Sequence, residues 1–398
     1  MHYLNGLVQL PWWGYIVFAL VVTHFTTMAV TLYLHRDATH RGLDLHPIVR
    51  HLCRFYLWLT TAIVTKEWVA VHRKHHARCE TEDDPHSPVV LGIGKVLREG
   101  AELYQAEARS EETTQKYGRG TPDDWLERNL YSRFPNAGIA LMALIDLILF
   151  GAIGITIWAV QMMAMPVLSA GVINGLGHWT GYRNFECDDA ATNLGPVGIL
   201  CGGEELHNNH HAFPSSAKFS ARRWEFDIGW MYICVLKAVG LAKVRRIMPE
   251  PEIAQRETSV DLETVRAIIL NRMHVLRDYS RTVTLPVLKL EATRFKEQSG
   301  ERAREMMRNA RRALTRRPEL LDARHQQKLQ QMLEHSQALK TVHEFRERLH
   351  SLWSGATVSN DKLIAQLREW CREAEATKIR ALQEFSQRLQ RYQMPQTA

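Results

Sequence analysis

Histidines in four short motifs give this sequence its most specific chemical signal, because a neutral imidazole nitrogen is a common metal ligand. Two motifs have the spacing H-x-x-H-H, and offsets of 0, 3 and 4 place three rings within an arc of about 100° on a helix. The other two are H-x-x-x-x-H and N-x-x-x-H. The four motifs contain His35, His40, His72, His75, His76, Asn174, His178, His207, His210 and His211.

The repetition of H-x-x-H-H argues against coincidence, because 19 histidines in 398 residues give about 0.04 copies by chance. A zinc site needs only three or four protein ligands, so nine clustered histidines are too many for one such ion. Two ions with four or five neutral nitrogens each would use all nine, and such nitrogen-rich sites suit redox iron. We therefore expect two iron ions that activate O2, with no catalytic residue apart from the metal ligands.

The remaining histidines lack this spacing, and we interpret them as ordinary core or surface residues. They are His2, His24, His46, His51 and His86, followed by His274, His325, His335, His343 and His350, which we expect at the surface. The six cysteines form no C-x-x-C pair. This argues against a disulfide framework and a thiolate zinc site, and it favours a reducing, cytosol-facing location.

Long uncharged runs predict the elements that position the motifs. Residues 12–34 contain no Asp, Glu, Lys or Arg, and about 20 apolar residues cross a bilayer as a helix. Residues 137–182 contain one charged side chain and predict two antiparallel spans with a bend near Met165 and Pro166. The uncharged run at residues 55–65 is shorter than a full crossing requires.

The expected ligands also constrain the topology. Only 31 residues separate His40 from His72, too few for two crossings, so residues 55–65 should lie in the interface or be buried against protein. Lys and Arg follow the first run but are absent from residues 1–11 and 161–166. Because positive charge near spans favours the cytoplasmic side, we expect a multi-pass inner-membrane protein with its N-terminus outside and its active site facing the cytoplasm. We expect no removable signal peptide.

The composition changes near residue 249, which predicts a membrane domain over residues 1–248 and a cytosolic, basic α-helical extension over 249–398. The extension carries 27 Lys and Arg against 20 Asp and Glu, which accounts for the whole net charge of +7. Its apolar residues recur at helical spacing at Leu329, Met332, Leu333, Leu339, Val342, Phe345 and Leu349. The extension either docks, oligomerises or touches anionic lipid, or it is a solvated bundle with no specific partner.

The expected fold is an all-α integral membrane protein in which a few transmembrane helices carry a cytosolic helical cap with the histidine-rich site. Its motifs resemble those of integral-membrane fatty acyl desaturases of the Δ9, acyl-CoA desaturase-like type, bacterial members included. The resemblance covers about residues 12–245. It rests on H-x4-H, E-W-x-x-x-H leading into H-x-x-H-H, the D-P-H at 84–86, N-x3-H followed by G-Y, and H-N-x-H-H. It implies that the nine histidines hold two irons and that Asn174 contributes through a water molecule.

The resemblance also implies the reaction. O2 and two electrons would remove two hydrogens from a saturated acyl chain, carried on CoA or phospholipid, and leave a cis double bond at Δ9. An apolar tunnel would bind the chain at about 0.8 kcal/mol per buried CH2. A membrane di-iron hydroxylase acting on an alkyl or acyl chain is the alternative. A metal carrier would instead place ionisable residues along its spans, and a scaffold led by the extension would not need the motif histidines.

Three features depart from the family pattern. Only about one span fits before the first motif, where the family has two; Asp37 and Ala38 replace a common Leu and aromatic; and the extension lies outside the shared core.

The sequence has no H-P-G-G haem motif, no G-x-G-x-x-G after a strand and no four-cysteine iron–sulfur pattern, so we expect a separate electron donor. The candidate donors are ferredoxin, rubredoxin or a cytochrome b5-like protein with its reductase, and no nucleic-acid partner is expected. An acidic donor would find basic residues at Arg41, Arg73, Lys74, Arg78, Arg222 and Arg223.

Overall fold

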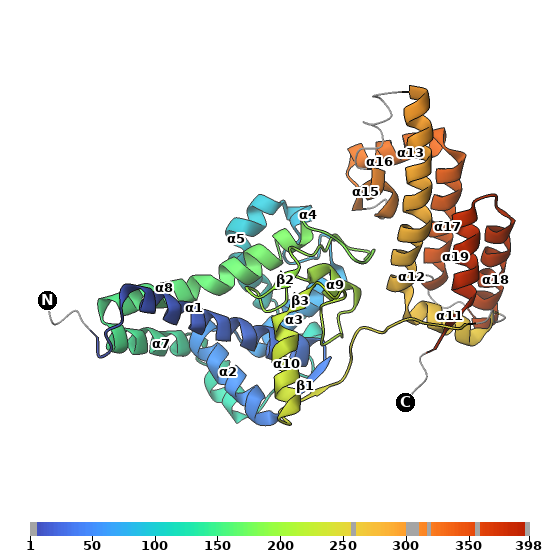
Figure 1. Cartoon of the computed structure of the whole chain (residues 1–398). Helices are drawn as coiled ribbons and strands as arrows, with labels where there is room; N and C mark the ends of the chain where they lie inside the picture. Colours follow the sequence, from blue (N-terminus) through green and yellow to red (C-terminus); the bar gives the residue numbers. More distant parts are fainter. Residues whose placement is uncertain (1–5, 256–259, 300–309, 317–319, 355–358, 395–398) are drawn as a thin grey trace. The chain divides into compact units, whose positions relative to one another are not determined.

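The computed structural model describes residues 6–255, 260–299, 310–316, 320–354 and 359–394. The chain forms two compact units, one of Met1–Asn184 with Asp189–Met248 and the other of Phe185–Asp188 with Pro249–Ala398. Helices dominate both units, and the described strands pair only in three short two-stranded sheets (Figure 1). The predicted all-α class with a helical C-terminal region is confirmed.

The first unit contains the long apolar helices and every motif histidine. Its elements are α1 (Trp12–Ala29), η2 (Val30–Thr39), β1 (Leu43–Leu45), α2 (Pro47–Thr61), α3 (Thr65–Arg78), α4 (Pro88–Leu91), α5 (Ile93–Ala108), α6 (Glu111–Tyr117), η3 (Glu127–Tyr131), α7 (Pro135–Phe150), α8 (Ala152–Met165), η4 (Pro166–Ile173), η5 (Leu176–His178), β2 (Val197–Gly198), α9 (His207–Ala212), β3 (Phe226–Asp227), α10 (Ile228–Ala238) and β4 (Ala242–Val244). Strand β1 pairs antiparallel with β4, and β2 pairs parallel with β3.

The first helix changes its winding before it reaches the histidines. α1 continues without a break into η2, a helix of the π type, in which the His40 N–H donates to the His35 carbonyl oxygen at 3.1 Å. The wider π turn brings residues five apart onto one face, whereas an α-helix would separate them by about 140°. The two rings consequently lie with their centroids 4.9 Å apart.

The predicted bend near Met165 and Pro166 is wrong, because the reversal occurs at Gly151. Gly151 ends α7 with φ +66° and ψ −142°, a conformation that is essentially restricted to glycine, and α8 packs back against α7. At Pro166 the chain continues into the π-type helix η4. Proline has no N–H to donate, and at this position it begins a wider turn instead of a bend.

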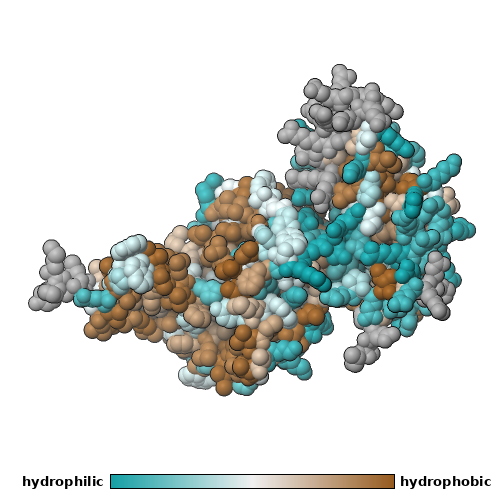
Figure 2. All heavy atoms as spheres, in the orientation of Figure 1, coloured by the Kyte–Doolittle hydropathy of each residue, from teal (hydrophilic) through white to brown (hydrophobic). Residues whose placement is uncertain are grey.

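Two stretches of helix, Trp12–Thr39 and Ala152–His178, are long and apolar enough to cross a membrane. Pro135–Phe150 and Ile228–Ala238 are shorter apolar helices. Helices α1, α2, α7 and α8 pack against one another, and their outward surface is strongly apolar (Figure 2). Its exposed side chains include Trp12, Ile16, Leu20, Phe25, Leu144, Ile148, Val160 and Met163. A contiguous apolar surface of this kind marks contact with a membrane or another protein.

The uncharged run at residues 55–65 does not form one helix. α2 ends at Thr61, Ala62 takes a left-handed conformation with φ +58°, and α3 begins at Thr65. Within the run, Leu57 and Trp58 are buried while Phe55 is exposed. The run therefore packs partly against protein, in agreement with the prediction that it does not cross.

A buried ion pair holds η2 against the segment that precedes α10. The Arg36 guanidinium donates to both carboxylate oxygens of Asp227, at 2.9 and 3.2 Å, and also to the carbonyl oxygens of Gly202 and Ala217. It lies 3.8 Å from the centroid of the Phe219 ring. Because both charged side chains are fully buried, this pairing fixes the position of η2, and of His35 on it, relative to the segments on either side of the H-x-x-H-H motif of α9.

The second unit is a helical bundle with its own apolar core. Its elements are β5 (Glu252–Ile253), α11 (Leu262–Leu270), α12 (Arg272–Tyr279), η6 (Ser280–Thr284), α13 (Leu285–Ser299), α15 (Ala310–Thr315), α16 (Ala323–His335), α17 (Gln337–Ser354), α18 (Asn360–Ala376), α19 (Arg380–Gln390) and β6 (Tyr392–Gln393). Strand β5 pairs antiparallel with β6. The apolar repeat predicted over 329–349 lies on two helices, because the Ser336 hydroxyl accepts from the Leu339 N–H at 3.2 Å and starts α17. Side chains of that repeat pack in the core around Trp370.

The reversal at Gly151 gives a testable prediction. Replacing Gly151 with Ala should lower the free energy of unfolding by about 1–3 kcal/mol, because the new side chain would have to occupy a backbone region essentially closed to it. Thermal denaturation of the full chain in detergent measures the effect. Gly195→Ala is the control, since its φ is not positive and a Cβ there meets no atom within 4 Å. Equal stability of the two variants would contradict the assigned turn.

Candidate metal centre

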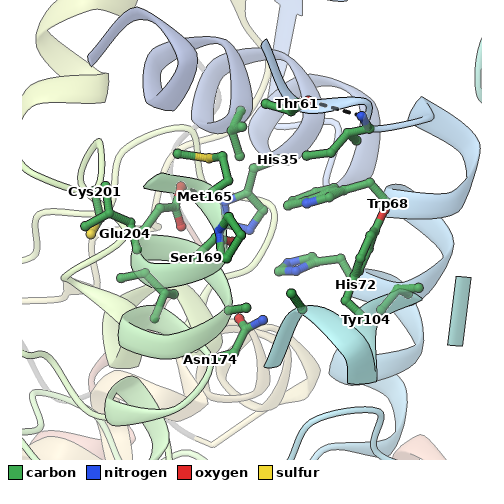
Figure 3. Close-up of a pocket in the computed structure, with 18 of the residues that line it drawn as sticks. His35, Thr61, Trp68, His72, Tyr104, Met165, Ser169, Asn174, Cys201 and Glu204 are labelled. Atoms are coloured by element: carbon green, nitrogen blue, oxygen red, sulfur yellow. Dashed lines mark hydrogen bonds and ion pairs between the residues drawn. The ribbon is translucent and has the colours of Figure 1, made fainter. Parts of the chain in front are cut away.

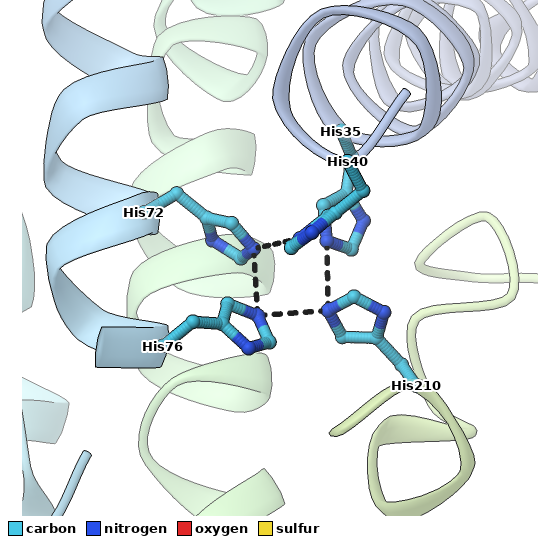
Figure 4. Close-up of side chains that lie close together, drawn as sticks. All are labelled: His35, His40, His72, His76 and His210. Carbon is cyan, nitrogen blue, oxygen red and sulfur yellow. Dashed lines mark hydrogen bonds between the residues drawn. The ribbon is translucent and has the colours of Figure 1, made fainter. Parts of the chain in front are cut away.

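Five histidine side chains converge where η2, α3 and α9 meet (Figure 4). This first group consists of His35, His40, His72, His76 and His210, and their ligand nitrogens all lie within 4.8 Å of one another. The His210 Nε2 is 3.0 Å from that of His35 and 2.9 Å from that of His76. The His72 Nε2 is 3.1 Å from those of His40 and His76. The rings therefore direct their nitrogens toward one common point.

Four further histidines form a second group directly beside the first. The group consists of His75, His178, His207 and His211, with ligand nitrogens again within 4.8 Å of one another. The Nε2 atoms of His178 and His207 are 3.0 Å apart. The two groups are contiguous, because the His76 and His211 rings stack with centroids 4.3 Å apart. All nine clustered histidines of the sequence are thus brought together, in one set of five and one of four.

Each H-x-x-H-H helix divides its side chains between the two groups. On α3, His72 and His76 belong to the first group and His75 to the second. On α9 the division is reversed, because His210 belongs to the first group while the other two motif histidines belong to the second. Residues four apart lie closest on a helix, so each helix gives an i, i+4 pair to one group and the intervening ring to the other.

Four carboxylates, of which Asp84 and Glu204 are buried and Glu80 and Asp189 half-buried, accept hydrogen bonds from four of the rings. Each accepts a hydrogen bond from a histidine Nδ1–H: Glu204 from His35 (2.7 Å), Asp84 from His75 (3.0 Å), Glu80 from His178 (2.9 Å) and Asp189 from His211 (2.8 Å). An ionised carboxylate only accepts, so the proton resides on Nδ1 and the Nε2 lone pair is left for an ion. Sequence reasoning assigned no role to these acids, although Asp84 belongs to the D-P-H motif and the others lie within a few residues of a motif or in the loop after His178.

Burial sets the charge of most of these rings. It lowers the pKa of six histidines far below the usual value, so they are neutral near pH 7; they are His40, His72, His76, His207, His210 and His211. Burial also opposes charge on His75, but the adjacent Asp84, with help from Glu80 and Asp189, raises its pKa overall. Neutral imidazole is the form that binds metal.

The residues present fit a metal ion in each group. The His211 Nε2 is buried and has no hydrogen-bond partner in the part of the chain that the structure describes, while its Nδ1 is held by Asp189. Neighbouring nitrogens in both groups are 2.9–3.1 Å apart. Two bonds of about 2.1 Å at a right angle place nitrogens about 3.0 Å apart, whereas a tetrahedral angle places them about 3.4 Å apart. The spacing suits a five- or six-coordinate ion.

Three other side chains lie near the groups. Asn174 lies in the wall of the neighbouring cavity. His86, interpreted as an ordinary residue, is buried with its ring 4.5 Å from that of His75, and burial lowers its pKa to about 3. The Cys79 sulfur lies 3.9 Å from the His75 Nε2 and from the His178 Nδ1, although the cysteine pattern predicted no thiolate site.

An apolar cavity of about 180 Å³ opens beside the histidines (Figure 3). His35 and His72 of the first group and His207 of the second form part of its wall. The rest is lined mainly by apolar side chains from η2, the turn before α3, α3, α5, α8 and η4, including Val30, Ile63, Trp68, Ala101, Met165, Leu168, Ala170 and Ile173. A molecule bound in this cavity would contact mainly apolar side chains, and it would meet the histidine groups at His35, His72 and His207.

Comparison with protein families gives two matches. Residues 10–225, more than half of the chain, match the family model described as fatty acid desaturase, and this range includes all nine histidines. Residues 264–395 match a model described as transposase. Among the described residues, every group able to hold a metal ion lies between His35 and His211, so the second matched region contributes none.

Curated relatives cover the same part of the chain. A probable chloroplastic lipid desaturase of Arabidopsis thaliana is 32% identical over 58% of this chain and 63% of its own length. An sn-1 stearoyl-lipid 9-desaturase of Synechocystis is 29% identical over 58% of this chain and 70% of its own. An icosanoyl-CoA 5-desaturase of Limnanthes douglasii is 31% identical over 54% of this chain and 60% of its own. The chain thus spans about three-fifths of the length of two of these relatives.

The lowered pKa values predict acid sensitivity of the metal-free protein. Unfolding releases six buried histidines that titrate near pH 6.5 in the unfolded chain, and the native state takes up their protons only at much lower pH. Their contribution is therefore present above about pH 6.5 and is lost as the pH falls below it. We expect the melting temperature of the metal-free protein to fall between about pH 7.5 and 5.5, measured by circular dichroism. The raised pKa of His75 acts in the opposite direction, but it is one histidine against six. A melting temperature that does not change over this pH range would contradict the burial of neutral rings.

Proposed function

This chain belongs to the fatty acid desaturase family, and from that premise we propose that it uses two iron ions, O2 and two external electrons to introduce a cis double bond into a saturated acyl chain. The observation that carries the proposal is the pair of adjacent groups, of five and four imidazoles, beside one apolar cavity. Bound iron would supply the oxygen activation and the hydrogen abstraction that side chains alone do not perform. With two protons from solvent, the products are the unsaturated chain and two water molecules.

The histidines of the two groups would hold one iron each. The four carboxylates fix the tautomer and the orientation of their rings, and a hydrogen bond of this type also makes the ligand nitrogen more basic. The remaining rings are kept neutral by burial, so they need not lose a proton to bind. Asn174, which lines the cavity, would contribute through a water molecule, as the family resemblance implies.

The cavity would hold the acyl chain with one methylene pair beside the histidines. Its apolar wall excludes water from the reacting segment, and each buried CH2 contributes about 0.8 kcal/mol to binding. The relatives act on stearoyl-lipid at position 9 and on icosanoyl-CoA at position 5 at nearly the same identity to this chain. We propose that the double bond is introduced at position 9 of an acyl chain that is carried on CoA or phospholipid. Product analysis identifies both the position and the carrier.

We propose a multi-pass arrangement in the inner membrane with the histidines on the cytoplasmic side. Leu7 and Val8 donate backbone hydrogen bonds to Ile148 and Leu149, so the N-terminal segment lies beside the reversal at Gly151. Residues 6–11 and the reversal contain no Lys or Arg, and both lie at the end of the helices away from the histidines. Positive charge at the histidine end then favours the cytoplasm.

Electrons would come from a separate acidic carrier, a ferredoxin, a rubredoxin or a cytochrome b5-like protein with its reductase. Of the basic residues that sequence reasoning offered to such a donor, Arg41, Arg78 and Arg223 are exposed. Two others are engaged inside the unit, because Arg73 donates to backbone carbonyl oxygens and Lys74 pairs with Glu107 at 2.8 Å. The three exposed side chains are the ones available for electrostatic attraction.

Expression in a host that lacks its own desaturase tests the activity. Wild type should produce monounsaturated lipid with a cis double bond, located by mass spectrometry, and His75→Ala and His210→Ala should reduce it to background, because each removes a ligand from one group. His51→Ala is the control, since His51 is exposed and belongs to neither group. A hydroxylated chain without an alkene would identify the hydroxylase instead, and no new product from iron-loaded protein would refute both.

Filling the cavity should impair the reaction without affecting iron. Ala170 lines the cavity, and Ala170→Phe should lower kcat/KM for long acyl chains by about 5- to 150-fold, the loss that corresponds to an overpacking cost of about 1–3 kcal/mol. Val167→Phe is the matched control, because Val167 lies on the same helix η4 with half of its surface exposed and does not line the cavity. Equal activities at equal iron content would show that the acyl chain binds elsewhere.

A further inference from the structure

A four-residue piece of the histidine-bearing half of the sequence belongs structurally to the second unit. The residues are Phe185–Asp188, in the loop between His178 and His207, and they cluster with Pro249–Ala398. The loop therefore leaves the first unit after Asn184 and returns to it at Asp189. The peptide bonds Asn184–Phe185 and Asp188–Asp189 therefore link the two units covalently, in addition to the bond between Met248 and Pro249.

Inside the second unit these residues are firmly bound. Phe185 is 1% exposed, with its ring 5.3 Å from that of His274, so the prediction that His274 lies at the surface is wrong. Glu186 accepts from the Ser280 hydroxyl at 3.0 Å and from the Arg346 guanidinium at 3.1 Å. The Arg346 side chain is only 3% exposed, so removing one partner of this ion pair would leave the other charge poorly solvated and unpaired.

Within the first unit, the residues that flank the segment hold the second histidine group. Asp189 accepts from the Nδ1–H of His211, and the Ala190 N–H donates at 3.2 Å to Glu80. Glu80 in turn accepts from the Nδ1–H of His178. Both carboxylates thus depend on the backbone position of Asp189 and Ala190, one and two residues beyond the segment. The first group has no such connection among the described contacts.

We propose that Arg346, Ser280 and Glu186 are positioning residues for the second iron: by anchoring Phe185–Asp188 they fix Asp189 and Ala190, which orient His211 and His178. The inference rests on the proposed di-iron function. It predicts that a change inside the helical unit weakens one metal position selectively. Loss of an outer hydrogen-bond partner of a ligand weakens metal binding by about 10–100-fold, which sets the upper limit of the effect.

The test is an anaerobic Fe²⁺ titration of the full-length protein, followed by Mössbauer spectroscopy to separate the two positions. Arg346→Ala should weaken the second Fe²⁺ and leave the first within twofold of wild type, and Arg346→Lys, which keeps the positive charge, should restore it. Asp189→Ala should give a larger effect of the same kind. In the Asp189→Ala background, Arg346→Ala should weaken the second Fe²⁺ by a smaller factor than it does in wild type, because the two changes share the hydrogen bond between Asp189 and His211.

Arg348→Ala is the matched control. Arg348 lies two residues along the same helix α17 and pairs with Glu373, so its loss removes an ion pair of the second unit without touching the segment. Unchanged binding in Arg346→Ala, or equal weakening of both positions, would overturn the proposal. If circular dichroism shows that Arg346→Ala is unfolded, Ser280→Ala, which removes one hydroxyl from the same carboxylate, is judged by the same criteria. Absence of stoichiometric iron in wild type would instead refute the proposed function.

Discussion

The arrangement of this protein depends on one electrostatic constraint: nine imidazole rings share a small buried volume, and they can do so only if nearly all of them are uncharged. Two protonated rings at these distances would repel strongly in a medium of low dielectric constant. Burial suppresses protonation of most of the rings, and four carboxylates determine which nitrogen of their partner carries the proton. The site is thus electrically prepared for cations before any cation binds.

The constraint also explains irregular backbone near the site. Five rings can converge only if their Cα atoms come from several elements, and a regular α-helix would turn either His35 or His40 away. The π-type winding of η2 removes this conflict at the cost of less favourable backbone hydrogen bonding. The buried pair of Arg36 and Asp227 holds the helix where that winding is useful.

Sequence reasoning worked where the signal was local and failed where it depended on backbone detail. The i, i+3, i+4 spacing identified the histidines of α3 and α9 without any structure, and the apolar runs identified α1, α7 and α8. The reversal at Gly151 was assigned instead to Pro166, because proline is a stronger general breaker than glycine and nothing local reveals a positive φ. The carboxylates were missed because acids near histidines are common, and only the fold shows that Glu80 and Asp189 face rings that are distant in sequence.

The loop between His178 and His207 shows how a second unit can be joined to such a site without disturbing it. Both ends of the loop are fixed by rings whose Nε2 atoms are 3.0 Å apart, so the loop is already closed by the second histidine group. The entropy of loop closure grows only slowly with length, so a loop long enough to include the segment costs little more to close than a shorter one. Phe185 and Cys187 of this segment are buried, while Asp189, the residue after the segment, lies within hydrogen-bonding distance of His211. A contact that Glu186 makes in one unit is in this way connected through Cys187 and Asp188 to Asp189, which holds a ligand in the other.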